Sequence, residues 1–405
     1  MISEEYSYPN NYDKLSISVN MPKLNANLVK DVALSNSPLS SRGALTIVGD
    51  NESSLPIDLL MVLDVSGSMS GDGITVLTES VIHTLDHLLR PQDKLAIITF
   101  NNSAKIHTNW TDKSGTVPPF TSSGGTNFGS AIKETLSFLG SHGRDESRAG
   151  IVLFLSDGHS SMPNAANVSA ITEFGFTMHT LGVTSGANPK HLEEMAELAR
   201  GYYFDAPDFN DVKKAFGSLF NYGKTVVYAA PDLGIKISDG VTLSELVQTP
   251  QGVKIHEDAL MAGDHTVSLT HMVQDSTGQL AFKINVDNVS DGDNLLAVFD
   301  CIGGSTELRV KGTLDKTELL ESPPNLDVTL ITKTSDVTGL LKTGDKAGAT
   351  RVITQIETLQ KKHPGAGSVT NTLTDVANAN SDGERLETLG KLKTTKDGKT
   401  ELRED

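Results

Sequence analysis

Oxygen-bearing side chains follow three separate segments of this sequence and could bind a hard metal cation. The apolar run Ile57–Leu63 is followed by Asp64-Val65-Ser66-Gly67-Ser68, which supplies one carboxylate and two hydroxyls. A Gly-rich segment adds the hydroxyl of Thr126, and the apolar run Gly150–Leu155 is followed by Asp157 after one serine. Hard cations such as Mg²⁺ prefer oxygen ligands. We therefore predict one metal site made by Asp64, Ser66, Ser68, Thr126 and Asp157, with Mg²⁺ as the ion and Mn²⁺ or Ca²⁺ as alternatives.

The composition of this donor set indicates what the metal would do. Three of the five donors are neutral hydroxyls, and no thiolate is offered. A bound divalent cation would therefore keep much of its positive charge and would favour an acidic group at an open coordination position. The partner that this chemistry suits is a protein offering an Asp or Glu side chain.

The elements that must position these donors belong to an α/β domain. Nearly continuous apolar runs of strand length are typical of strands buried on both faces of a parallel sheet. Such runs occupy Ile57–Leu63, Lys94–Phe100, Gly150–Leu155 and Phe176–Val183. Helical periodicity separates or follows them at Val76–Leu89, Phe128–Leu139, Pro189–Arg200 and Asp208–Phe220. The alternation predicts a doubly wound, mostly parallel, Rossmann-like sheet, which binds ligands at the carboxyl ends of its strands.

The flanking segments predict a β-sandwich. Alternating runs at Lys14–Val19 and Ala44–Val48 precede the α/β domain. Short strands separated by turn residues follow it, at Thr225–Tyr228, Gly234–Ile237, Gly252–Ile255, His265–Leu269, Gln279–Ile284, Asn294–Phe299 and Thr306–Val310. If the early strands pair with the later ones, the α/β domain is an insertion in the sandwich.

The last part of the chain is expected to be helical. Lys346–Lys362 and Val369–Leu392 carry apolar residues at helical spacing, with a Pro-Gly-Ala-Gly break between them, and a charged tail follows. The resulting division is 1–55 for the first sandwich strands, 56–222 for the α/β domain, 223–332 for the rest of the sandwich and 333–405 for the helical hairpin and tail.

The site motifs resemble those of a known family. DVSGSMSG, GGTN and LSDG occur in this order and spacing, and they resemble the metal-ion-dependent adhesion site of von Willebrand A domains, over residues 56–222. The resemblance implies that Ser66, Ser68 and Thr126 are direct or nearly direct ligands, and that Asp64 and Asp157 act directly or through water. The wider arrangement is similar to inter-α-trypsin-inhibitor heavy chains and to plant A-domain ubiquitin ligases, although this chain lacks a RING-type Cys/His cluster.

Other kinds of site fit the sequence less well. No nucleophile elbow, phosphate-binding loop or dinucleotide fingerprint appears, so we expect neither catalytic nor cofactor-binding residues and no enzyme. His83 and His87 have the spacing of a zinc pair but lack further ligands, and we expect surface histidines. Asp287–Asn294 is compatible with a Ca²⁺ loop and equally with a hairpin turn.

The composition of the chain limits the classes of partner and the compartment that we expect. The chain has 34 Lys and Arg against 51 Asp and Glu, a formal charge of −17, which disfavours nucleic acid and anionic lipid. No apolar run is long enough to span a membrane. The single Cys301 and an N-terminus without a secretory pattern favour the cytoplasm, with an exported or surface-associated protein as the alternative. The leading functional hypothesis is a metal-dependent interaction or adhesion module. The alternatives are a subunit of a self-assembling complex or filament, hence a homo-oligomer, and a regulatory partner of an AAA+ ATPase.

Overall fold

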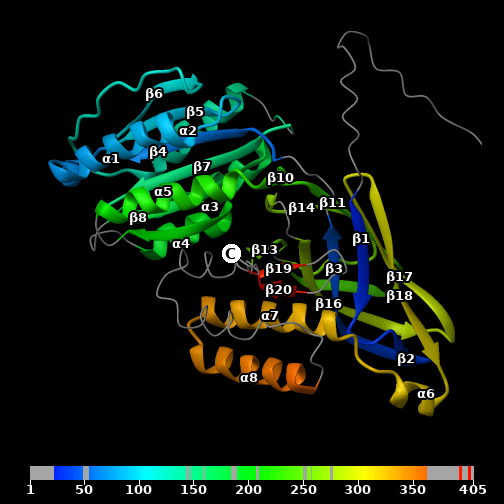
Figure 1. The fold of residues 1–405 in the computed structure, drawn as a ribbon. Coiled ribbons are helices and arrows are strands. Elements are labelled where there is room, and N and C mark those ends of the chain that lie inside the picture. Colours follow the sequence, from blue (N-terminus) through cyan, green and yellow to red (C-terminus); the bar gives the residue numbers. More distant parts are fainter. Residues whose placement is uncertain are drawn as a thin grey trace, which may run out of the picture.

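A computed structural model of the chain places an α/β domain beside a two-sheet β-structure with a pair of helices (Figure 1). It describes residues 22–48, 54–142, 145, 147–157, 160–183, 189–206, 209–249, 253–256, 258–273, 277–362, 392–394 and 400–402. The strand expected at Lys14–Val19 lies outside these residues.

The α/β domain is built on a six-stranded sheet with the order β6-β5-β4-β7-β8-β9. Its strands are β4 (Ile57–Asp64), β5 (Lys94–Phe100), β6 (Ala104–Thr111), β7 (Ala149–Ser156), β8 (Phe176–Val183) and β9 (Arg200–Ala206). All neighbours are parallel except β5 and β6, which are antiparallel. The edge strands β6 and β9 are additions to the predicted sheet. Most residues of β6 are exposed or half-buried, so it lacks the apolar run that marks the central strands.

Helices cover both faces of this sheet, as predicted for a doubly wound fold. They are α1 (Asp72–His83), α2 (Phe128–His142), α3 (Ala165–Ser169), α4 (Pro189–Leu198) and α5 (Phe209–Gly223). On β4, Met61 and Leu63 point to a core shared with α1 and α5, while Leu60 and Val62 point to a core shared with α2 and α4. Because successive strand residues face opposite sides, a strand covered on both faces must be apolar throughout.

Two five-stranded sheets form the second body. One has the order β1-β3-β16-β12-β13 and the other β14-β11-β17-β18-β2. Their bounds are β1 (Lys23–Leu28), β2 (Val32–Leu34), β3 (Ser37–Val48), β11 (Asp232–Ile237), β12 (Val241–Thr249), β13 (Val253–Lys254), β14 (Gly263–Ser268), β16 (Thr277–Val289), β17 (Gly292–Cys301) and β18 (Gly304–Thr313). Strand β3 precedes the α/β domain in the chain and pairs antiparallel with β16, which follows it. The α/β domain is therefore inserted in the chain between two strands, β3 and β16, that pair with each other in one sheet.

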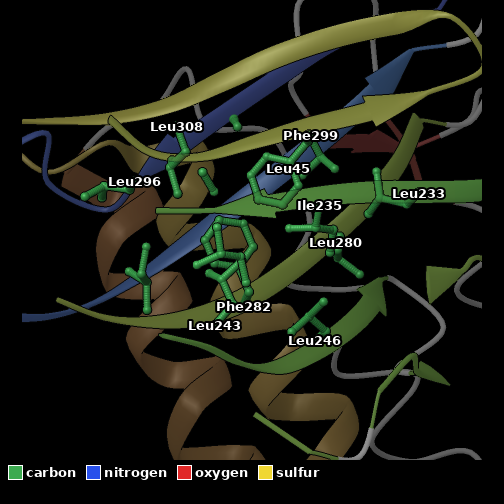
Figure 2. Close-up of a cluster of buried hydrophobic side chains, with 14 of the residues drawn as sticks. Leu45, Leu233, Ile235, Leu243, Leu246, Leu280, Phe282, Leu296, Phe299 and Leu308 are labelled. Carbon is green, nitrogen blue, oxygen red and sulfur yellow. The ribbon is translucent and has the colours of Figure 1, made fainter. Parts of the chain in front are cut away.

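The two sheets share one hydrophobic core. Figure 2 shows Leu45 of β3 and Phe282 of β16 close to Phe299 of β17 and Leu308 of β18. The ring centroids of Phe282 and Phe299, one from each sheet, are 5.7 Å apart. Cys301 is buried in this core, as its apolar strand context indicates.

The helices after the last sandwich strand are α6 (Lys316–Glu321), α7 (Leu326–Lys342) and α8 (Lys346–Lys362). Val328 and Ile331 of α7 pack on Ala44 and Ala281 of the first sheet, and α8 packs in turn on α7. Helix α8 has the predicted bounds, but its partner is α7. A second helix was expected at Val369–Leu392, but residues 369–391 lie outside the described part of the chain. Two short paired strands, β19 (Leu392–Thr394) and β20 (Thr400–Leu402), follow.

The link between the two bodies is hydrogen-bonded. Leu55 donates its N–H to the carbonyl of Val226 at 2.7 Å, which joins the chain entering the α/β domain to β10 (Val226–Tyr228) leaving it; β10 pairs with β15 (Met272–Val273). The buried His271 accepts a hydrogen bond from Ala230 N–H at Nδ1 and contacts the carbonyl oxygen of Gly150 in β7 through Nε2 at 2.8 Å. Burial lowers the pKa of His271 to about 4. A neutral imidazole with its proton on Nε2 satisfies both contacts.

The position of the linkers shows which end of the six-stranded sheet lies away from the second body. Strand β4 runs for eight residues from the linker to Asp64, a length of roughly 26 Å at about 3.3 Å per residue. The carboxyl ends of β4, β5 and β7 therefore point away from the linkers. None of the helices in the described part of the chain has the length and apolar character needed to cross a membrane.

Candidate metal site

The carboxyl ends of β4 and β7 bring four of the five predicted donors into one hydrogen-bonded chain. The hydroxyl oxygens of Ser66 and Ser68 are 3.0 Å apart, and Ser68 donates to Oδ1 of Asp157 at 2.8 Å. Asp64 joins the chain through the backbone N–H of Ser66, which donates to its Oδ1 at 2.8 Å. Residues 89 positions apart in sequence thus meet at one edge of the sheet.

Asp64 is a fully buried carboxylate with its orientation fixed. Its Oδ1 accepts from Ser66 N–H, and its Oδ2 accepts from the hydroxyl of Ser156 at 2.5 Å. Burial raises the pKa of Asp64 to about 6, more than these hydrogen bonds lower it, and the charge of Asp157 raises it further. The ionised form of Asp64 is therefore costly in the folded protein unless a cation compensates for it.

Asp157 follows β7 directly and is 7% exposed. Burial raises its pKa also, against the hydrogen bond from Ser68 that lowers it. Two partly or fully desolvated carboxylates thus lie on either side of two hydroxyls. This is an electrostatic environment that a divalent cation would relieve.

Backbone contacts hold the turn after β4 against two neighbouring segments. Val65 donates its N–H to Phe100 O of β5 at 2.8 Å, and Gly67 donates to Gly124 O at 2.9 Å. Ser123 N–H donates to Val65 O at 2.9 Å. A Cβ on Gly67 would lie 3.3 Å from the carbonyl oxygen of Gly124, so the close approach of the loop favours glycine here. The turn and the Gly-rich loop therefore form one unit.

Thr126 lies on that loop, just before α2. Gly125 N–H donates to Oδ1 of Asn102 at 3.0 Å, and Oδ1 of Asn127 caps α2 by accepting from Ser130 N–H at 3.0 Å. These bonds fix the backbone on either side of Thr126. Among the described residues, the Thr126 side chain is half-buried and forms no hydrogen bond to the other four donors. The structure thus joins the Thr126 segment to the site while leaving its hydroxyl outside the hydrogen-bonded chain.

Three residues that the sequence analysis did not single out support the site. Ser156 orients Asp64, while Asn101 and Asn102 hold the loop, with Asn101 Nδ2 donating to Ser123 O at 2.9 Å. A signal for them exists in the sequence. Ser156 immediately precedes Asp157, and the asparagines immediately follow the apolar run Lys94–Phe100, so all three occupy the edge of the sheet where ligands bind.

The donor set depends on its hydroxyls. Within the part of the chain that is described, no group of three or more His, Cys, Asp or Glu side chains gathers as metal ligands. Asp64 and Asp157 contribute only two carboxylates, so a cation here would need Ser and Thr oxygens or water to complete its coordination. Such a set suits Mg²⁺, which commonly binds to one or two carboxylates and retains water.

The other sites considered from the sequence are accounted for structurally. The rings of His83 and His87 have centroids 4.9 Å apart, and both side chains are exposed, as expected for surface histidines. In the segment Asp287–Asn294, the Asn294 side chain accepts from Ser290 N–H at 2.9 Å and donates to Ser290 O at 2.8 Å, within the turn between β16 and β17. This arrangement is that of a hairpin turn.

Comparison with known proteins identifies the α/β domain. The family model of the von Willebrand factor type A domain matches residues 58–218. An uncharacterised protein of Synechocystis sp. is 23% identical over 299 residues, which span 70% of this chain and 69% of that protein. Two solved structures have a TM-score of 0.63: a von Willebrand factor type A protein from Catenulispora acidiphila, at 14% identity, and the ArnB paralog VWA2 from Sulfolobus acidocaldarius, at 16%.

These structural similarities extend beyond the α/β domain. The similarity to the Catenulispora protein covers 97% of this chain and 95% of that protein. The similarity to the Sulfolobus protein covers 92% of this chain and 98% of that protein. At such identities the similarity concerns the fold. Together with the family match, the sheet order and the residues at its edge, it shows that residues 58–218 form a von Willebrand factor type A domain.

Proposed function

We propose that this chain is a metal-dependent protein-interaction module. In this proposal Asp64, Ser66, Ser68, Thr126 and Asp157 hold Mg²⁺, and the partner contributes an Asp or Glu carboxylate. The observation that carries the proposal is the hydrogen-bonded chain from the Asp64 turn through two serine hydroxyls to Asp157. The type A domain supports it, since domains of this family generally mediate protein–protein interactions. We propose no catalytic role.

The protein's own residues prepare the site in three ways. Ser156 and the backbone N–H of Ser66 orient the Asp64 carboxylate. The hydroxyls of Ser66 and Ser68 lie between the carboxylates, so oxygen donors are already gathered before a ligand arrives. The burial of Asp64 keeps bulk water from it and so strengthens its interaction with a positive charge.

The charge balance favours an acidic partner. The two carboxylates carry at most two negative charges, and the serine and threonine donors are neutral. A bound Mg²⁺ would supply a Lewis-acidic position that attracts a carboxylate from outside the chain. In a protein of formal charge −17, which repels acidic surfaces, an open coordination position on the metal would favour the docking of an acidic side chain at this point.

Calorimetric titration of Mg²⁺ into the full chain and into Asp157→Ala tests the proposal. Loss of one direct or water-mediated ligand should weaken Mg²⁺ binding at least about tenfold. Asp86→Ala is a matched control, because Asp86 is an exposed acidic residue of the same domain outside the site. Identical Mg²⁺ isotherms for the wild type and Asp157→Ala would refute the site assignment.

A further inference from the structure

A cavity of about 220 Å³ lies directly beside the turn that carries the proposed metal ligands. We propose that this cavity is a second acid-binding pocket, which receives another carboxylate of the same partner that reaches the metal. The inference rests on the proposed function and adds to it the class of partner: a peptide segment with two acidic side chains close together in sequence.

The cavity shares its wall with the candidate metal site. Val65 lines it and lies between Asp64 and Ser66 in the chain. Ser123 also lines it, and its N–H donates to Val65 O. A partner whose side chain reaches the Asp64 turn therefore places its neighbouring residues at the mouth of the cavity.

Lys105 also lines the cavity and gives it a positive charge. Thr99 of β5 pairs with Lys105 of β6, so their side chains lie on the same face of the sheet, and His107 follows two residues along. The ring of His107 packs on Phe120, with centroids 4.7 Å apart. None of the residues lining the cavity is acidic, although the chain has 51 Asp and Glu residues. Lys105 forms no ion pair within the described residues, so its ammonium group is available to an anion.

Thr99 gives an independent indication that a polar group belongs in the cavity. This residue lines the cavity and is 2% exposed, and its hydroxyl oxygen has no hydrogen-bond partner among the described residues. A buried hydroxyl without a partner destabilises a protein, and such groups are rare unless they serve a ligand or a water. A carboxylate entering beside Lys105 would accept the hydrogen bond that Thr99 can donate.

Binding of fluorescent peptides, measured by anisotropy in Mg²⁺ and in EDTA, tests this inference. One peptide carries a single Asp flanked by glycines, and a series carries two Asp residues separated by glycine spacers of increasing length. The variants are Lys105→Gln and Thr99→Val, with Lys133→Gln as the control because Lys133 is an exposed lysine of α2. Thr99→Val keeps the side-chain volume and removes the unsatisfied hydroxyl, so it should melt no lower than the wild type.

We expect the second Asp to increase the affinity of the peptide only at one length of the glycine spacer. In Mg²⁺, wild type and Lys133→Gln should bind the best two-acid peptide about fivefold more tightly than the one-acid peptide, the size of an exposed charge pair. Lys105→Gln and Thr99→Val should lose this gain and retain normal binding of Mg²⁺ and of the one-acid peptide.

The possible failures can be told apart. If all peptides bind equally in Mg²⁺, or if Lys105→Gln keeps the gain, the second pocket is refuted and the proposed metal site stands. If Lys105→Gln weakens one-acid and two-acid peptides alike, Lys105 acts through general electrostatics and the pocket is also refuted. If no peptide binds in a Mg²⁺-dependent way, the proposed function fails and the pocket fails with it.

Discussion

Replacing Asp64 by Asn should stabilise the metal-free protein at neutral pH while abolishing its stabilisation by Mg²⁺. Asn is nearly the same size as Asp, can still accept from Ser66 N–H and can donate to the Ser156 hydroxyl, so the packing of this buried residue is preserved. What changes is the cost of holding a negative charge where burial opposes it. The two effects have opposite signs, and this makes the experiment decisive.

The magnitude follows from the pKa of Asp64, which burial raises from 3.8 to about 6. Between these values the folded state binds more protons than the unfolded state, so the stability of the metal-free protein falls as pH rises through this window. The ionised carboxylate then costs up to about 3 kcal/mol near pH 7 and about 1.5 kcal/mol near pH 5. Asp64→Asn should gain these amounts relative to wild type.

The cation reverses the comparison. Saturating Mg²⁺, at about 100 times its Kd, would stabilise the wild type by about 2.7 kcal/mol, whereas the Asp64→Asn variant should gain little. Because Mg²⁺ needs the ionised carboxylate, this gain should shrink from pH 7 to pH 5.

Chemical and thermal unfolding of both proteins, followed by circular dichroism in EDTA and in Mg²⁺ at both pH values, measures these differences. The difference between variant and wild type cancels the titrating groups that do not interact with Asp64; Asp157 does interact with it, and its titration shifts in the same comparison. A variant no more stable than wild type in EDTA at pH 7, or one equally stabilised by Mg²⁺, would refute the electrostatic account of the site.

Two further predictions concern groups around the site and at the domain link. Ser156→Ala should raise the pKa of Asp64 further and weaken Mg²⁺ binding by about tenfold, as measured calorimetrically, because it removes a hydrogen bond to the ionised carboxylate; unchanged affinity would contradict this role. The pKa of the buried His271 is lowered to about 4, so its contribution to stability is complete above pH 6.5 and is lost as pH falls toward 4. In His271→Gln the unfolding midpoint should therefore depend less on pH between 6.5 and 4 than in the wild type. The same dependence on pH in both proteins would contradict this.

The central strands could be recognised in the sequence because a strand that is buried on both faces is apolar along its whole length. Residues Ile57–Leu63 and Gly150–Leu155 face helices on both sides, so neither strand can tolerate alternation. Strand β6 lacks such an apolar run, because an edge strand is less covered by helices and its exposed positions can be polar. Helix α7 was also not expected, since its apolar residues spread around the helix between the sheet on one side and α8 on the other.

The sequence by itself determined the doubly wound sheet and the oxygen donors at the strand ends, because parallel strands bring their carboxyl ends to one edge. Its motifs indicated a type A domain by their resemblance to that family. Asp64, Ser66, Ser68 and Asp157 could therefore be grouped by position alone. Only the tertiary structure decided which of them touch, that Ser156 and two asparagines support them, and that Thr126 remains outside the hydrogen-bonded chain. It also decided the raised pKa of Asp64 and the partnerless hydroxyl of Thr99. Both depend on desolvation, which is set by segments distant in sequence that pack over the same edge.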